Sequence, residues 1–324
     1  MSAAEHAVSV VLTCYNEGPY IGAAVRSVLS QTRLDRIESI VVADDGSNPD
    51  TVAILRQIET WDPRISVVYG RGGAGLPAQR NLAISRTRAP FIAILDGDDL
   101  WTADKLEQQL GVLAADDRIG LVYSGYFTFP AESLAAANRA RVLDLSRARD
   151  LTRAYFLNDP PIIPSTTLIR RSAFERCGGF DAGVRTFEDT DFYLRLSRVC
   201  GFAFVERPLL YKRNHSASIT GHRKDLMTHH ALVAFKAAAD EPRLLALVPR
   251  RLAERARKLG NHRFLLGDRA EAQRLLSLAV RLDVRNFRAW TSWFTVRFFG
   301  RIAGFLLASR LRARRAALGV ATDT

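Results

Sequence analysis

Short apolar runs alternate with stretches of helical spacing over the first 125 residues. The apolar runs are rich in β-branched residues and lie at 8–12, 39–43, 65–69, 91–95 and 120–124. Between them, apolar residues recur every three or four positions, as at 20–30 and 76–85, which predicts helices. Uninterrupted apolar strands are typical of a parallel sheet covered on both faces. We therefore expect an α/β fold with a doubly wound, mostly parallel sheet.

The remainder of the chain has a different pattern. Residues 126–165 are less regular, and the Ala/Arg-rich stretch 131–154 indicates a helix or a mobile segment. Further strands are expected at 166–170, 202–206 and 209–213, with helices near 172–177 and 189–199. From 227 onward the spacing is helical throughout. The pattern divides the chain into an α/β domain at 1–226 and an all-helical region at 227–324, which contains a helix hairpin near 250–290.

Composition excludes several classes of protein. Hydrophobic residues make up 48% and charged residues 25%, which is ordinary for a globular chain. The three cysteines form no C-x-x-C pair, so neither a disulfide framework nor a zinc site is indicated and a reducing compartment is expected. No basic segment followed by an apolar core precedes the first strand, so we expect no signal peptide.

The net charge of +12 is concentrated at one end of the chain. Residues 1–240 hold 28 basic and 28 acidic residues, whereas 241–324 hold 18 basic and 6 acidic ones. A neutral body with a basic arm argues against a nucleic-acid-binding protein. The arm is either a docking segment for an anionic surface or a solvated arginine-rich face.

Two acidic clusters directly follow predicted strands. Asp44 and Asp45 follow 39–43, and Asp96 and Asp98 follow 91–95. Ligands of open α/β sheets bind beyond the carboxyl ends of the strands. Asp-Gly-Asp is also ordinary turn chemistry, but two clusters at strand ends predict a hard-cation site of the kind that shares Mg²⁺ or Mn²⁺ with substrate phosphates. Asp99 is expected to be a favourable charge at the start of the next helix, with Thr102 as its cap and Asp50 capping an earlier helix.

These segments resemble the family 2 glycosyltransferases, which have the GT-A fold. The resemblance covers roughly 8–220 and rests on order and spacing as well as on single motifs. The segments are VSVVLTCYNEGPYIGAAVRSVLSQT, VVADDGS, GLPAQRNLAIS, FIAILDGDDLW, FEDTDFYLRL and YKRNHSASIT.

The resemblance implies two ligand sets. The first would bind the donor nucleotide, with Tyr15 stacking on the base and Arg80 reaching the diphosphate. Its members are Thr13, Tyr15, Glu17, Asp44, Asp45, Arg80, Asp96 and Gly97. The second would hold Mn²⁺ or Mg²⁺ through Asp98 and Asp96, with His215 completing the site or contacting phosphate. A loop histidine is otherwise usually just solvated.

The acidic pair Glu188-Asp189 would act on the acceptor. An inverting transfer needs one carboxylate to take the acceptor hydroxyl's proton as that oxygen attacks the sugar. The resemblance makes Asp189 this base and leaves Glu188 to orient the site. The alternative is an acidic first turn that only caps the helix.

The expected enzyme adds single sugars. The sequence lacks the Gln-x-x-Arg-Trp of processive polysaccharide synthases and any apolar span long enough for an export channel. A UDP-sugar is the donor expected from the resemblance, with GDP and dTDP open. The acceptor is a glycan, a lipid-linked sugar or a protein, as in bacterial cell-surface polysaccharide, glycolipid or glycoprotein assembly. The alternatives are a catalytically silent scaffold subunit and a sugar nucleotidyltransferase.

The last predicted helix has a distinctive composition. At 290–315, tryptophan and phenylalanine cover most of the helix, and arginines fall within one narrow stripe. Such a helix suits the interface of an anionic membrane. Docking on the protein or on a second copy in a homodimer is the alternative. We therefore expect a cytoplasmic protein, either free or peripheral on the inner face of the membrane.

Overall fold

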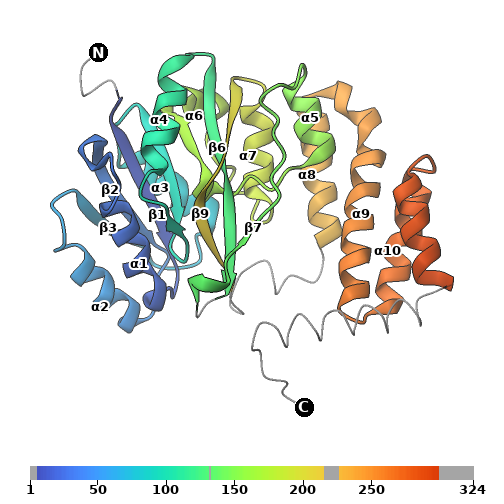
Figure 1. Ribbon diagram of the computed structural model, residues 1–324, viewed down its shortest axis with the longest axis horizontal. Coiled ribbons are helices and arrows are strands. Elements are labelled where there is room, and N and C mark those ends of the chain that lie inside the picture. Colours follow the sequence, from blue (N-terminus) through green and yellow to red (C-terminus); the bar gives the residue numbers. More distant parts are fainter. Residues whose placement is uncertain (1–5, 131–132, 215–225, 299–324) are drawn as a thin grey trace. The chain divides into compact units, whose positions relative to one another are not determined.

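The computed structural model describes residues 6–130, 133–214 and 226–298 (Figure 1). The chain separates into two compact units. The first comprises Met1–Tyr155 with Asp159–His222, and the second comprises Phe156–Asn158 with Arg223–Thr324. The first contains the predicted sheet and the second is helical.

The first unit is built on one mixed, mostly parallel sheet of nine strands over the described residues (Figure 1). Its path runs β3-β2-β1-β4-β8-β6-β9-β5, and β7 pairs with β6 off this path. The strands are β1 Val8–Cys14, β2 Ile37–Asp44, β3 Ile65–Tyr69, β4 Phe91–Asp96, β5 Leu100–Trp101, β6 Ile119–Pro130, β7 Asn138–Arg139, β8 Leu168–Arg170 and β9 Gly201–Asn214. The five strands expected from the apolar runs are all present.

Helices connect and cover these strands. They are α1 Gly18–Leu29, α2 Pro49–Ile58, α3 Leu76–Ser85, α4 Lys105–Ala115, α5 Leu151–Asn158, α6 Arg171–Cys177 and α7 Glu188–Leu196, with short 3₁₀ turns at Leu34–Arg36, Leu134–Ala136 and Pro164–Thr166. One face of β1, β2 and β4 packs against apolar residues of α1, α2 and α4 in a continuous core. Burial of this core is the main term that stabilises the sheet.

Several local expectations are wrong, and each has a physical reason. Asn48 caps α2, because its side-chain oxygen accepts the Thr51 N–H at 2.9 Å, whereas Asp50 lies within the first turn. Asp104, rather than Thr102, is the N-cap residue of α4. Asp99 is fully buried before that helix and accepts the Arg213 backbone N–H at 3.0 Å. Tertiary packing decides these positions.

Two longer segments also differ from the prediction. The runs at 202–206 and 209–213 form one strand, β9, whose register with β6 shifts near Gly125 and Pro208. A bulge bends a strand without ending it, so the proline does not separate two strands. Within 133–150 the chain holds only the 3₁₀ turn and the two-residue β7, so no helix forms before α5.

The second unit is helical where the structure describes it. It contains α8 Leu226–Asp240, a 3₁₀ turn at Pro242–Leu247, α9 Val248–Leu265, α10 Arg269–Leu282 and a helix at 287–298. Gly260 on α9 packs closely against Leu276 on α10. A Cβ added to Gly260 would lie 2.8 Å from Leu276 Cγ. Among the described residues no helix has the length and apolarity needed to cross a bilayer.

Candidate active site

The sheet register brings the two acidic clusters to one edge. β1 lies between β2 and β4, with Cys14 opposite Asp44 and Thr13 opposite Asp96 in parallel pairing. Adjacent strands lie about 4.8 Å apart, so the carboxylates end on neighbouring strands. This confirms the expectation that both clusters meet at the carboxyl edge of the sheet.

The first cluster shapes the loops around the edge. The buried Asp44 carboxylate accepts the Ser47 N–H. Asp45 accepts N–H groups of Ala74 and Gly75 and the Gln79 side chain, at 2.8–3.1 Å. In this structure Asp45 therefore holds the glycine-rich loop before α3.

The loop after β1 presents an aromatic ring to solvent. Tyr15 is 60% exposed, so its face is available to a planar ligand. The next residue, Asn16, has a positive φ of 57°. Its Oδ1 accepts the Asn48 N–H and its own N–H donates to Ser47, both at 2.8 Å. These bonds fix the position of Tyr15 beside Thr13, which is buried at the end of β1.

Arg80 joins the second cluster to the acidic pair on α7. Its Nη2 lies 2.7 Å from Asp96 Oδ1 and its Nη1 lies 3.1 Å from Glu188 Oε1. The guanidinium is 1% exposed and lies 5.4 Å from the Phe180 ring centroid. Burial would raise the pKa of Asp96, but Arg80 holds that pKa below its ordinary value. The described arrangement uses Arg80 as a bridge between carboxylates.

The acidic pair begins α7 directly. Phe187, the N-cap, has a left-handed φ of 60°, an unusual conformation for a large side chain and one that recurs at functional sites. It turns the chain so that Glu188 faces Arg80. Burial, and then the neighbouring Glu188 charge, raises the pKa of Asp189 to about 7. A carboxyl with this pKa can take up a proton near neutral pH.

Further carboxylates crowd around Gly97. An added Cβ there would lie 2.8 Å from the Thr13 carbonyl oxygen and 2.1 Å from Glu17 Oε2, and the backbone contact in particular requires glycine. Burial, followed by the charges of Asp98, Asp96 and Asp99, raises the pKa of Glu17 well above its ordinary value. Glu17 Oε2 is buried and has no hydrogen-bond partner among the described residues.

The carboxylate oxygens of this cluster are ligands of the kind that a hard cation prefers. Mg²⁺ commonly takes one or two protein carboxylates and shares substrate phosphates. Among the described residues no three carboxylate, histidine or cysteine side chains converge on a point that could hold a metal. Asp98 and the unpartnered Glu17 oxygen therefore fit a site that is completed by a diphosphate. The predicted ligand His215 lies outside the described residues.

Three residues at this edge were not predicted. Ser165 accepts the Asp96 backbone N–H at 3.0 Å, and its carbonyl accepts Trp101 Nε1–H at 2.8 Å. Arg213 Nε donates to the Asp98 carbonyl at 3.0 Å. The charges of Asp99, Asp96 and Asp98 outweigh burial and raise the pKa of Lys212. Lys212 and Arg213 lie in the family-like segment YKRNHSASIT, so the sequence could have pointed to them. No sequence pattern indicated Ser165.

Comparison with known proteins agrees with the family resemblance seen in the sequence. Residues 9–178 match the sequence profile described as Glycosyl transferase family 2. A Bacillus subtilis glycosyltransferase named for teichuronic acid biosynthesis, TuaG, is 45% identical over 103 residues, which are 32% of this chain and 40% of that protein. The Escherichia coli UDP-Glc:alpha-D-GlcNAc-diphosphoundecaprenol beta-1,3-glucosyltransferase WfgD is 33% identical over 122 residues, or 38% and 46%. The chain thus spans less than half the length of these two relatives.

Solved structures share the fold. S. aureus TarS 1-349 in complex with UDP-GlcNAc superimposes with a TM-score of 0.64 at 15% identity, covering 90% of this chain and 91% of that one. The mannosyltransferase PcManGT from Pyrobaculum calidifontis, in complex with GDP-Man and Mn²⁺, gives a TM-score of 0.59 at 18% identity, covering 93% and 84%. At such identities the likeness concerns the fold alone, which is GT-A. The profile match over residues 9–178 shows that this chain belongs to glycosyltransferase family 2.

Proposed function

We propose that this chain transfers a sugar with inversion from a nucleotide diphosphate donor to an acceptor hydroxyl, with Asp189 as the base. One observation carries the proposal: the buried Arg80 guanidinium ties Glu188, the neighbour of Asp189, to the strand-end carboxylate Asp96. Burial, and then the Glu188 charge, raises the pKa of Asp189 to about 7, which suits a base. An inverting displacement needs one ionisable base opposite the leaving group. Arg80 thus connects the helix that carries the proposed base to the strand end where the donor would bind.

Each residue then has a defined part. Asp189 accepts the acceptor hydroxyl's proton as that oxygen attacks the anomeric carbon. Glu188, fixed by Arg80, keeps the start of α7 in place. Tyr15 offers its exposed ring to the base of the nucleotide, with Thr13, Asp44 and Asp45 behind it. The parallel register of β1 with β2 and β4, which brings their carboxyl ends together, supports this assignment.

The cofactor of this reaction would be Mn²⁺ or Mg²⁺, and Asp98, Asp96 and His215 would hold it. When bound, it would neutralise the charge that develops on the departing diphosphate. Glu17 supports this proposal, because its partnerless oxygen and raised pKa show how closely negative charge is packed around Gly97.

The donor we favour is a UDP-sugar, and the reaction is a single addition in bacterial cell-surface glycan assembly. The relatives named above for teichuronic acid biosynthesis and for UDP-Glc transfer support this choice.

We also propose a cytoplasmic location with attachment to anionic membrane through 290–315, of which 299–315 lies outside the described residues. Phe287, Trp290, Phe294 and Phe298 follow one another at helical spacing and are 43–77% exposed. Ala289 and Val296, on the other face of the same helix, are buried in the second unit. Such an exposed aromatic stripe beside arginines is typical of an interfacial helix. The rival occupant is a second copy of the chain.

Calorimetric titration with UDP, GDP and dTDP, each with and without Mn²⁺, tests the donor assignment. We expect one nucleotide, UDP, to bind tightly only when the metal is present. Failure of all three to bind the folded protein would contradict the proposal and favour a silent scaffold. Release of UDP from a UDP-sugar in the presence of acceptor would then establish turnover.

A further inference from the structure

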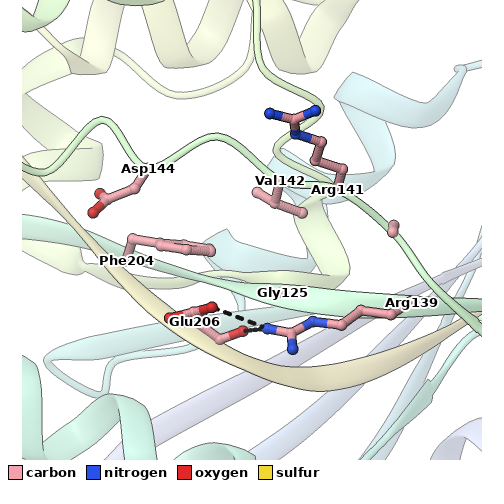
Figure 2. Close-up of a pocket in the computed structure, with 8 residues that line it drawn as sticks. Gly125, Arg139, Arg141, Val142, Asp144, Phe204 and Glu206 are labelled. Atoms are coloured by element: carbon pink, nitrogen blue, oxygen red, sulfur yellow. Dashed lines mark hydrogen bonds and ion pairs between the residues drawn. The ribbon is translucent and has the colours of Figure 1, made fainter.

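A pocket of about 620 Å³ lies on the first unit, and none of the predicted donor residues lines it (Figure 2). Its floor is formed by β6 and β9, and the segment after β7 passes over it. Six of the lining residues carry the argument that follows: Gly125, Arg139, Arg141, Asp144, Phe204 and Glu206.

The floor of the pocket contains one aromatic ring. Phe204 is partly buried, and its ring centroid lies 5.0 Å from that of Tyr123, its partner on the neighbouring strand β6. Tyr123 is fixed in turn, because its hydroxyl donates to the Leu143 carbonyl and accepts the Leu145 N–H, both at 2.8 Å. Figure 2 shows Phe204 lying below the segment that carries Val142 and Asp144. The ring is therefore a rigid platform whose free face suits the C–H face of a sugar.

Charged groups surround this platform. Arg139 is already engaged, since its Nη2 donates to the Glu206 carbonyl at 2.9 Å and lies 3.5 Å from its carboxylate (Figure 2). Arg141 makes no hydrogen bond or ion pair with any described residue, so its guanidinium is available. Guanidinium groups bind carboxylates through paired, charge-assisted hydrogen bonds. Two acidic residues also line the pocket, but Glu206 is paired with Arg139 and Asp144 Oδ1 accepts the Ser146 N–H. The Arg141 guanidinium beside the Phe204 ring is therefore the group that fits a sugar carrying a carboxylate.

The sheet register places this pocket near the proposed reaction centre. Ile92 on β4 pairs with Ile169 on β8, and Ile169 pairs with Leu121 on β6. Since β4 and β6 run in the same direction, four residues further on Asp96 and Gly125 reach a similar level. Where β8 lies between them, β4 and β6 are two strand spacings apart, which is about 10 Å.

The pocket also opens on the appropriate face of the sheet. Leu95 and Tyr126 both point into the core that α1 and α4 cover. Successive side chains of a strand alternate between faces, so Asp96 and Gly125 belong to the opposite face. That is the face on which Arg80 joins Asp96 to Glu188. The pocket and the acidic pair therefore share one face of the sheet.

We infer that this pocket is an acceptor subsite that binds an acidic sugar ring, with Phe204 stacking on the ring and Arg141 pairing with its carboxylate. This inference rests on the proposed function, because it assigns the pocket to the acceptor of that reaction. It implies that the acceptor is an extended, uronate-containing glycan, of which a ring beyond the reacting one occupies the pocket.

Saturation-transfer NMR with two disaccharides tests this inference. The probes are cellobiouronic acid, which carries a carboxylate, and neutral cellobiose. We expect transfer to the uronate ring, with an affinity that falls roughly tenfold in Arg141→Ala because a hydrogen bond to a charged group is lost. Phe204→Leu should abolish transfer to the ring protons. Arg147→Ala, an exposed arginine of the same segment outside the pocket, is the matched control and should bind as the unaltered protein does.

Three results would overturn the inference: no transfer to either disaccharide, equal affinity for both, or uronate binding that Arg141→Ala and Phe204→Leu leave unchanged. Calorimetry with UDP and Mn²⁺ on the same samples separates this failure from failure of the proposed function. Normal UDP binding without disaccharide binding rejects the pocket alone. Loss of both rejects the proposed function as well.

Discussion

Arg80 and Glu188 form a buried ion pair, with Nη1 3.1 Å from Oε1, across 108 residues of sequence. The same guanidinium binds Asp96 at 2.7 Å. It therefore connects the strand that ends in the Asp-Gly-Asp segment to the helix that carries the proposed base. The first two predictions follow from this connection.

Replacing Arg80 with methionine should destabilise the protein by about 3 kcal/mol, because removal of one partner leaves buried carboxylates uncompensated. Thermal unfolding, monitored by circular dichroism, measures this change. Arg118→Met is the control: Arg118 also pairs with an aspartate, Asp116, but its side chain is 90% exposed. Its melting temperature should equal that of the unaltered protein. Equal effects of the two substitutions would show that burial of the Arg80 pairs contributes nothing.

The pH dependence of transfer should have an acidic limb near pH 7. Asp189 acts as a base only when ionised, and burial together with Glu188 raises its pKa to about 7. Below that value kcat/KM should fall about tenfold per pH unit. Glu188→Gln removes a charge that raises this pKa, so the limb should move to lower pH. A limb that moves upward, or stays fixed, would contradict the assignment.

Asp189→Asn should lower kcat by about 10²–10⁴, the usual contribution of a general base, and leave UDP affinity largely unchanged. Single-turnover release of UDP measures the first quantity and calorimetry the second. Asp117→Asn, at a side chain that is 97% exposed, should have neither effect. Unchanged turnover in Asp189→Asn would exclude this residue as the base.

The ion pair between Arg80 and Glu188 shows which parts of the structure the sequence predicts and which it does not. Apolar runs predicted five strands, and the aspartates that directly follow two of them predicted acidic clusters at the carboxyl edge of a parallel sheet. The insertion of the antiparallel β8 between β4 and β6 was not predicted. The contact between Arg80 and Glu188, in contrast, depends on how α3 and α7 pack, which no local spacing encodes. Ser165 was missed for the same reason. The pocket with Phe204 and Arg141 also joins segments far apart in the chain, and 131–154 was expected to be helical or mobile.

Asp98→Asn should weaken the effect of Mn²⁺ on UDP binding without abolishing metal-free binding. Mn²⁺ takes hard oxygen ligands, and an amide is a weaker ligand than a carboxylate. UDP titrations with and without Mn²⁺ measure the difference. Asp116→Asn serves as the control, since that residue lies in an exposed turn with Arg118. If Mn²⁺ changed UDP binding equally in the unaltered protein, in Asp98→Asn and in Asp116→Asn, Asp98 would not belong to the proposed metal site.

Membrane attachment should depend on the exposed aromatic stripe of the helix at 287–298. Trp290, Phe294 and Phe298 are 43–62% exposed, and replacing all three with serine keeps the buried Ala289 and Val296 on the other face of the helix. The triple variant should lose sedimentation with phosphatidylglycerol vesicles. The unaltered protein should bind these vesicles in a salt-sensitive manner, since each basic residue near an anionic surface contributes about 1 kcal/mol.

The control for this experiment lies in the same unit of the protein. Leu232 and Phe235 on α8 are 62% and 53% exposed, so replacing both with serine removes comparable apolar surface elsewhere. If exposed apolar area alone caused attachment, both variants would be impaired. If the helix at 287–298 is the anchor, only the triple variant is. Retained vesicle binding by the triple variant, or a loss of dimerisation in its place, would assign the aromatic stripe to a second copy of the chain.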